Sequence, residues 1–210
     1  TSSLVNNNVV DSLYHLGMPG TTATTMYGIY LSNTSPGQVF RNNQVTNLFT
    51  TGASTGNQSM WGMYIAPSGA NAVFRNNIVS GIRSAATQNG VIYGMQLAGS
   101  TTAGTRKDFA ANTISNLSAG GSTGNIRGIQ ISGGTEWYVY NNAISRISAS
   151  LSAPASIGQQ VLGVDISATT ATNAYFLYNN SIYLTGNGGG VNFATSGIHA
   201  NSGPALTLVN

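Results

Sequence analysis

The sequence predicts an all-β solenoid, a parallel β-helix of about six coils with about 34 residues in each coil. Three observations favour this fold class. Two sequence markers recur with one common period, apolar residues alternate with a period of two, and the composition disfavours helix. The chain holds 27 Gly but a single Lys and a single Glu. Its frequent polar residues are Ser, Thr and Asn, which are poor helix formers.

A repeat unit is clearest in two consecutive segments, 27–48 (YGIYLSNTSPGQVFRNNQVTNL) and 61–82 (WGMYIAPSGANAVFRNNIVSGI). A Gly followed by an aliphatic residue marks the first half and recurs in steps of 34, 32, 34, 35 and 34 residues, at Gly28, Gly62, Gly94, Gly128, Gly163 and Gly197. An Asn marks the second half and recurs in steps of 35, 34, 35, 30 and 38 residues, at Asn8, Asn43, Asn77, Asn112, Asn142 and Asn180. Because two independent markers share one period, we interpret the chain as a stack of structural repeats.

Each unit predicts three short strands rather than a pair of helices. Helix-pair repeats have a similar length, but Ile29 and Leu31 flank Tyr30, and period-two alternation is typical of a half-buried strand. The third strand is predicted to bury the residues two and five after the Asn marker, as at Val45 and Leu48. The second strand is predicted to bury the residue three before it: Val5, Phe40, Phe74, Phe109, Val139 and Leu177. Each such side chain contributes about 1.5–3 kcal/mol when buried, so stacked columns suffice for a core.

The Asn marker is predicted to lie at a tight corner between the second and third strands. Asn tolerates the left-handed backbone region better than most residues. Its amide can also bond to the Asn one coil away, which predicts an Asn ladder along the axis. The preceding position is mostly Asn as well, at Asn7, Asn42, Asn76, Asn141 and Asn179, with Ala111 as the exception. One column is expected to face the interior and the other to form the corner, and the sequence leaves open which is which.

The order of strand, variable loop, strand, tight Asn corner, strand and long variable loop resembles the right-handed parallel β-helix superfamily, the pectate-lyase-like solenoids. The resemblance covers essentially the whole chain. It implies a right-handed solenoid whose first strand binds carbohydrate on its outer face. The Ser/Thr/Asn/Gly-rich, lysine-poor composition is also similar to the repeats of large secreted surface proteins of Bacteroidetes-type bacteria. That second resemblance implies an extracellular location on a bacterial cell surface.

Composition disfavours several classes of protein and partner. Cysteine is absent, so no disulfide or thiolate metal site is expected. Charged residues make up 5% of the chain, and the seven basic residues behind the net charge of +3 are spread over the coils. Nucleic acid is therefore not an expected partner, since it requires clustered Lys and Arg. No apolar run is long enough to cross a bilayer, so we expect no membrane insertion.

Residues 1–210 are predicted to form one β-helix domain that is a slice of a longer repeat array. Leu4-Val5-Asn6 recurs as Leu208-Val209-Asn210 after 204 residues, which equals six repeats of 34. No capping segment is recognisable at either end, although solenoids need caps to stay soluble. The expected partners are therefore further repeats of the same chain, or another copy, at the open ends.

The acidic residues that could support catalysis are few: Asp11, Asp108, Glu136 and Asp165. Asp108 and Glu136 approach the second strand in neighbouring coils and are the only near pair, whereas glycoside hydrolysis needs two carboxylates that flank one bond. The lyases that the chain resembles bind calcium through clustered acidic residues and use a basic residue as proton acceptor, and no such cluster is recognisable. We expect a protein without catalytic activity, metal or cofactor, with a polysaccharide lyase or hydrolase as the alternative.

One outward column on the first strand is the candidate binding surface. It holds the residue between the two buried positions of each coil: Tyr30, Tyr64, Gln96, Gln130, Asp165 and His199. Stacked rungs lie about 4.8 Å apart, aromatic faces stack on sugars, and amides supply paired donors and acceptors. The neighbouring Gly column is expected to leave the surface low enough for a ligand to approach. Asp165 and His199 could pair, and an outer ladder covered by a loop or another subunit is the structural alternative.

These observations predict a non-catalytic structural or adhesive module of an extracellular bacterial surface protein. The first alternative is a carbohydrate-binding or carbohydrate-cleaving β-helix that contacts surface glycans through the column from Tyr30 to His199. The second alternative is a subunit of an end-to-end fibre.

Overall fold

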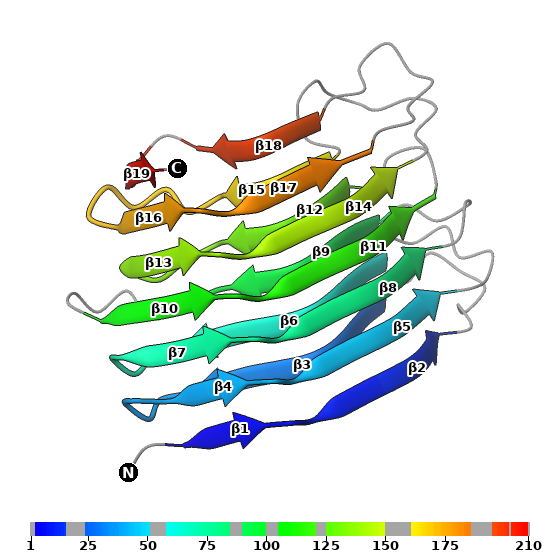
Figure 1. Ribbon diagram of the computed structural model, residues 1–210, viewed down its shortest axis with the longest axis horizontal. Helices are drawn as coiled ribbons and strands as arrows, with labels where there is room; N and C mark the ends of the chain where they lie inside the picture. The colour runs from blue at the N-terminus through cyan, green and yellow to red at the C-terminus, as the bar shows by residue number, and fades with distance from the viewer. Residues whose placement is uncertain are drawn as a thin grey trace.

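The computed structural model describes residues 3–15, 24–50, 58–84, 90–99, 105–120, 125–149, 161–185, 195–201 and 203–209. Within these ranges the chain forms strands and no helix, and it winds as a right-handed parallel β-helix (Figure 1). The predicted fold class is confirmed. The predicted number of coils is slightly too high. The structure makes about five turns, since the six stacked strands of sheets B and C are separated by five steps.

Three parallel sheets, A, B and C, form the walls of the solenoid. Sheet A contains the predicted second strands: β1 (Leu4–Asn6), β4 (Val39–Arg41), β7 (Ala72–Arg75), β10 (Arg106–Ala110), β13 (Glu136–Tyr140), β16 (Ala174–Tyr178) and β19 (Ala205–Val209). Sheet B contains the predicted third strands: β2 (Val9–His15), β5 (Gln44–Thr50), β8 (Ile78–Ser84), β11 (Thr113–Ala119), β14 (Ala143–Ala149) and β17 (Ser181–Leu184). Sheet C contains the predicted first strands: β3 (Thr24–Asn33), β6 (Gln58–Pro67), β9 (Gly90–Leu97), β12 (Asn125–Ile131), β15 (Val161–Ile166) and β18 (Thr195–Ala200).

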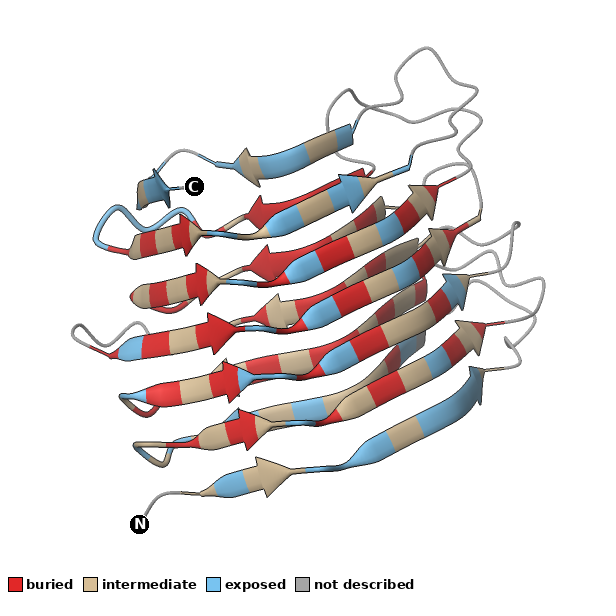
Figure 2. Cartoon of the chain, viewed as in Figure 1, coloured by how far each residue is buried: buried red, intermediate tan, exposed pale blue. Residues whose placement is uncertain are grey.

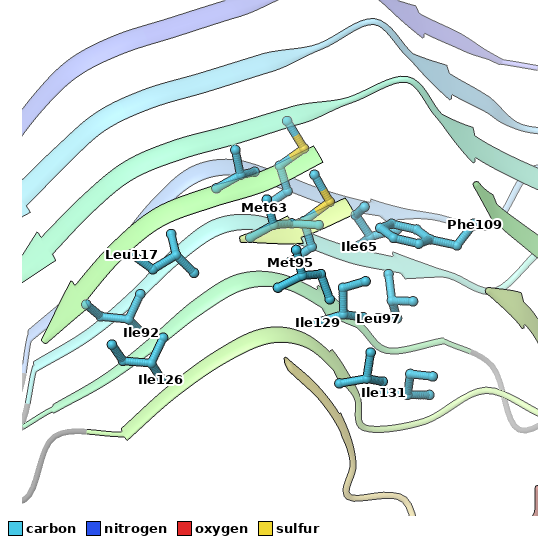
Figure 3. Close-up of a cluster of buried hydrophobic side chains, with 14 of the residues drawn as sticks. Met63, Ile65, Ile92, Met95, Leu97, Phe109, Leu117, Ile126, Ile129 and Ile131 are labelled. Atoms are coloured by element: carbon cyan, nitrogen blue, oxygen red, sulfur yellow. The ribbon is translucent and has the colours of Figure 1, made fainter. Parts of the chain in front are cut away.

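The predicted inward columns belong to one cluster of buried apolar residues, and Figure 2 shows buried residues recurring along the strands of the middle turns. In sheet A the predicted column is at most 2% exposed in the middle turns, at Phe40, Phe74, Phe109, Val139 and Leu177. Figure 3 shows side chains of the three sheets together in the interior, with Met63 and Met95 of sheet C between Leu117 of sheet B and Phe109 of sheet A. One continuous apolar core therefore runs along the axis.

The two adjacent Asn columns divide the roles that the sequence left open. The first column has left-handed φ angles of 52–58° and forms the corner, at Asn7, Asn42, Asn76, Ala111, Asn141 and Asn179. The second column, from Asn8 to Asn180, forms the ladder. At each step the backbone N and Nδ2 of one Asn both donate to Oδ1 of the next Asn, over 2.8–3.1 Å. The predicted Asn ladder at one corner is confirmed.

A second left-handed column, which was not predicted, bends the strands of sheet B from β2 to β14. Its residues have φ angles of 53–72°: Ser12, Asn47, Gly81, Asn116 and Arg146. Because the bend shifts the alternation by one residue, side chains three apart, such as Val45 and Leu48, are both fully buried. The spacing of three in the predicted inward columns was the sequence signal for this bend.

Candidate functional site

All six residues of the predicted outward column lie in one row on sheet C. Strand pairing aligns Tyr30 with Tyr64, then Gln96, Gln130, Asp165 and His199 in successive strands. The row has an aromatic half on β3 and β6 and a polar half from β9 to β18. The exposed fraction falls from 58% at Tyr30 to 2% at Asp165, so the two halves offer different chemistry.

A second row, three residues earlier in each strand, runs beside the first and was not predicted. It holds Tyr27, Trp61, Tyr93 and Arg127 on β3, β6, β9 and β12. Tyr27 stacks on Trp61 with ring centroids 4.8 Å apart, and Trp61 stacks on Tyr93 at 4.9 Å. The guanidinium carbon of Arg127 lies 5.4 Å from the Tyr93 ring centroid. The aromatic residue directly before the Gly marker in three successive coils was the signal for this row.

The stacked rings restrict how a sugar could bind. The rings of Tyr30 and Tyr64 lie 5.0 Å apart with an interplanar angle of 3°, so the ring faces turn toward each other. The ring of Tyr27 stands edge-on to both, at 5.2 and 5.9 Å. A sugar ring therefore cannot stack between Tyr30 and Tyr64. At β3, the edge strand of sheet C, the faces of Tyr27 and Tyr30 that turn away from β6 have no aromatic neighbour among the described residues.

Gln96 connects the aromatic half to the polar half. Trp61 Nε1 donates to Gln96 Oε1, and Gln96 Nε2 donates to Ser132 Oγ at 2.9 Å. Burial raises the pKa of Tyr93 against a smaller lowering effect of Arg127, and burial likewise raises the pKa of Tyr64. Both phenols are therefore protonated at neutral pH and can donate a hydrogen bond.

Asp165 is the centre of the polar half. Its Oδ2 accepts hydrogen bonds from Arg127 Nε at 2.6 Å and from Gln130 Nε2 at 3.2 Å, and its Oδ1 lies 2.9 Å from His199 Nδ1. The side chain of Asp165 is 4% exposed and that of Arg127 is 13% exposed, so this ion pair is shielded from water. The predicted contact between Asp165 and His199 exists, but it belongs to a network of four side chains.

This network can position groups and hold a ligand, but Asp165 is not free to act as a base. Three contacts occupy its carboxylate, which makes it an anchor for Arg127 and His199. Arg127 Nη1 is buried and has no hydrogen-bond partner within the described residues. An acceptor atom of a ligand could satisfy this buried donor.

The Gly column of sheet C leaves room for side chains of the core and does not open the outer surface. A Cβ atom on Gly62 would lie 2.3 Å from Cγ1 of Val79 in sheet B and 2.6 Å from the carbonyl oxygen of Gly94. The same close approach recurs at Gly28, Gly94, Gly128 and Gly163. The expectation that these glycines open the outer face to a ligand is therefore wrong, because the missing side chains would point into the core.

The predicted near pair of carboxylates, Asp108 and Glu136, lies on neighbouring strands of sheet A. Strand pairing sets Asp108 opposite Tyr138 and Glu136 opposite Arg106, so the two carboxylates are offset by two residues. Arg106 donates two hydrogen bonds to Asp108, at 3.0 and 2.8 Å. A hydrogen bond with Glu136 raises the pKa of Tyr138. Each carboxylate therefore has a partner of its own.

Within the described ranges, no group of three or more His, Cys, Asp and Glu side chains could hold a metal ion. No helix in those ranges is long and apolar enough to cross a membrane.

No protein-family model matches the chain, and neither a curated protein nor a solved structure matches it. Function therefore has to be argued from the arrangement of the side chains themselves.

Proposed function

We propose that the chain is a non-catalytic structural and adhesive module, a stiff rod within an extracellular bacterial surface protein. The Asn ladder carries this proposal, because it runs without a break from Asn8 to Asn180 and joins each turn to the next by two hydrogen bonds. Bending the rod would break bonds of buried amides, each of which costs about 1–3 kcal/mol when left unpaired. A stiff rod is suited to hold a binding surface away from a cell.

The resemblances seen in the sequence support the same proposal. The right-handed winding and the Asn corner between the second and third strands agree with membership of the pectate-lyase-like superfamily. The Ser/Thr/Asn/Gly-rich composition supports an origin in a secreted surface protein of a Bacteroidetes-type bacterium. In this proposal the solenoid keeps the fold of the superfamily and has lost its lyase chemistry.

Apolar side chains exposed in the first and last turns support further repeats as the partner at the open ends. Leu4, Val9, Leu208 and Val209 are 54–66% exposed. Successive strand pairs align Val5, and not Leu4, with Leu208. The strand register therefore differs by one residue from the spacing of the two Leu-Val-Asn segments, because the steps along the column are unequal.

The strand count favours further repeats over a second copy at the C-terminal edge. Sheet A has seven strands, whereas sheets B and C have six strands each. A copy that added its β1 to β19 would leave sheets B and C each one strand short at the junction. A repeat that next supplies a strand to sheet B and then one to sheet C leaves no gap, so the end-to-end fibre is the less favoured assembly.

Surface labelling tests the location, and product analysis tests the lack of activity. An antibody against the solenoid should label intact producing cells as strongly as permeabilised cells, and labelling only after permeabilisation would contradict the proposal.

Purified protein should release no reducing ends or unsaturated sugars from a panel of polysaccharides. Product release that disappears in Asp165→Asn would show instead that the sheet C network is catalytic.

A glycan site at the β3 end of sheet C is the second candidate function, favoured by the open ring faces of Tyr27 and Tyr30. A glycan array should then show binding that Tyr30→Ala abolishes. Tyr140→Ala is the matched control, because Tyr140 stacks on Tyr178 at 4.9 Å on sheet A. Equal loss in both variants, or no glycan bound by the wild-type protein, would rule out this site.

A further inference from the structure

A groove runs across the strands of sheet B, parallel to the solenoid axis. It consists of two adjoining hollows with volumes of about 510 and 400 Å³. The first hollow crosses β2, β5 and β8, and the second extends from β5 to β14 and ends at Thr185, just after β17. Asn47, Gly81 and Arg83 line both hollows, so these form one continuous groove, which we call the sheet B groove.

The left-handed column of sheet B forms the floor of this groove. All five of its residues line one hollow or both: Ser12, Asn47, Gly81, Asn116 and Arg146. Each strand bends at the same position, so the bends align along the axis and hollow the face. The groove is therefore a product of the repeat itself and not of one loop.

Two arginine side chains make the groove positive. Arg83 lies where the two hollows meet, and Arg146 lies two strands further along the sheet, on β14. Two strand spacings of about 4.8 Å separate them by about 10 Å along the axis. Both residues are exposed, and the ion pairs among the described residues involve other side chains. Guanidinium groups bind carboxylates and similar oxyanions through paired N–H donors.

Hydroxyl and amide groups line the groove between the arginines. Ser80 Oγ accepts hydrogen bonds from Ser115 Oγ at 3.1 Å and from Asn116 Nδ2 at 3.0 Å. The hydroxyl hydrogen of Ser80 is therefore available to a ligand. Ser118 and Ser148 line the second hollow as well. A row of such groups matches the hydroxyl groups of a sugar chain.

The β2 end of the groove has a different character. Tyr14 and Phe49 line it with ring centroids 3.8 Å apart, and Tyr14 is 58% exposed. The carboxylate of Asp11 stands nearby and accepts hydrogen bonds from Thr46 Oγ1 at 2.6 Å and Asn47 Nδ2 at 2.8 Å. Its negative charge disfavours an anionic group at this end, whereas the exposed ring can pack against an uncharged sugar.

We propose that the sheet B groove binds an extended acidic glycan, a sugar chain that carries carboxylate or sulfate groups. Anionic groups pair with Arg83 and Arg146, sugar hydroxyls bond to Ser80 and Asn116, and an uncharged sugar unit lies against Tyr14. Single-stranded nucleic acid fits less well, because it carries a phosphate on every nucleotide and the groove holds only these two arginines among the residues that line it. The site is separate from sheet C, and its failure would leave the rod-like function untouched.

Calorimetric titration of the 210-residue chain tests the ligand class with four probes. These are an oligogalacturonate, a sulfated heparin-derived oligosaccharide, a neutral dextran oligosaccharide and oligo(dT). We expect an acidic glycan to bind at least about tenfold more tightly than dextran, with an affinity that falls as salt rises. The tighter of the two acidic probes identifies carboxylate or sulfate as the preferred group. Tighter binding of oligo(dT), or no binding of either acidic glycan at low salt, would overturn the proposal.

Three substitutions test the place of binding. Arg83→Gln and Arg146→Asn should each weaken the acidic glycan about tenfold, and together they should weaken it further. Asn is chosen at position 146 because it tolerates the left-handed φ of 53°. Arg75→Gln removes one charge from an exposed arginine on sheet A and should change the affinity less than about twofold. Equal losses in Arg75→Gln and Arg83→Gln, or wild-type affinity in the double variant with an unchanged melting temperature, would show that the groove is not the site.

Discussion

Asn77 donates two hydrogen bonds to a single atom of Asn112: its backbone N and its Nδ2 both lie 2.9 Å from Oδ1 of Asn112. Oδ1 of Asn77 in turn accepts two hydrogen bonds from Asn43, both at 3.0 Å. Each inner ladder residue thus accepts from one neighbour and donates to the other, so the amides all point the same way along the axis. The four inner members, Asn43, Asn77, Asn112 and Asn142, are at most 1% exposed, and these buried polar side chains are stable because the bonds satisfy them.

Replacing Asn77 by Leu should destabilise the solenoid strongly. The change removes the two bonds that Asn43 donates to Oδ1 of Asn77 and the two that Nδ2 of Asn77 donates, to Oδ1 of Asn112 and to the carbonyl oxygen of Phe40. Each group left unpaired costs about 1–3 kcal/mol, so we expect a loss of several kcal/mol in urea denaturation. Thr113→Leu is the control, because Thr113 is exposed and pairs with Ile78, which shows that an apolar residue fits that column. Equal losses in the two variants would show that the ladder does not stabilise the fold.

Replacing Ala111 by Asn should stabilise the protein. Ala111 is the one member of the corner column without an Asn side chain, and its φ of 52° is left-handed. This conformation costs a residue with a Cβ roughly 1–2 kcal/mol, and Asn offsets part of that cost through local hydrogen bonds. We expect a gain of about 0.5–1 kcal/mol, measured as a higher urea midpoint. Ala143→Asn at an exposed position of β14 is the control. A gain of the same size there would point to a general effect of Asn.

The sequence was sufficient to predict the sheets, the inward columns and the ladder, because each depends on a residue type that recurs once per turn. It did not distinguish the two Asn columns, since a buried amide and a left-handed corner both favour Asn. The bend at Asn47 was visible only as the spacing of three between Val45 and Leu48. The stacking of Tyr27 on Trp61 was not predicted, because the interpretation of this strand centred on the Gly that follows each of these aromatic residues.

The candidate site was predicted as a row but not as two chemically distinct halves. Position along the axis follows from the repeat, which is why Asp165 and His199 were expected to pair. The partners that change their chemistry, above all Arg127, come from the adjacent row, and only the actual side-chain directions reveal them. The sheet B groove was not predicted, because it results from backbone bends.

Replacing Gly94 by Ala should destabilise the solenoid, whereas the same change at Gly197 should be tolerated. A Cβ atom on Gly94 would lie 2.5 Å from the carbonyl oxygen of Gly128 and 2.5 Å from Cγ2 of Ile114. Relief of such contacts in a packed core costs about 1–3 kcal/mol. A Cβ atom on Gly197 would meet no atom within 4 Å. If thermal melting shifted equally in both variants, backbone freedom and not close packing would explain the Gly column.

Lys107 is a charged side chain inside the core. It is 0% exposed, and its Nζ donates to the carbonyl oxygen and to Oγ1 of Thr105 at 2.8 and 2.9 Å. Its Nζ also lies 5.6 Å from the ring centroid of Trp137. Burial lowers the pKa of Lys107 from 10.5 to about 8, against a smaller raising effect of Glu136. Lys107 lies two residues before the buried Phe109, so the period-two alternation of the strand directs its side chain inward. A charged residue is nevertheless unexpected at an inward position.

Stability should therefore rise with pH between about 8 and 10, which is the reverse of ordinary alkaline denaturation. In this window the unfolded chain keeps the proton of Lys107 and the folded chain has released it, so raising the pH favours the folded state. Below about pH 8 both states are protonated and the cost of burying the charge is constant; above about pH 10 titration of the buried tyrosines opposes the gain. Lys107→Met should be more stable than the wild type at neutral pH and should lose this rise. Urea denaturation of both proteins at several pH values in the window measures the effect, and parallel pH profiles would show that Lys107 is not its source.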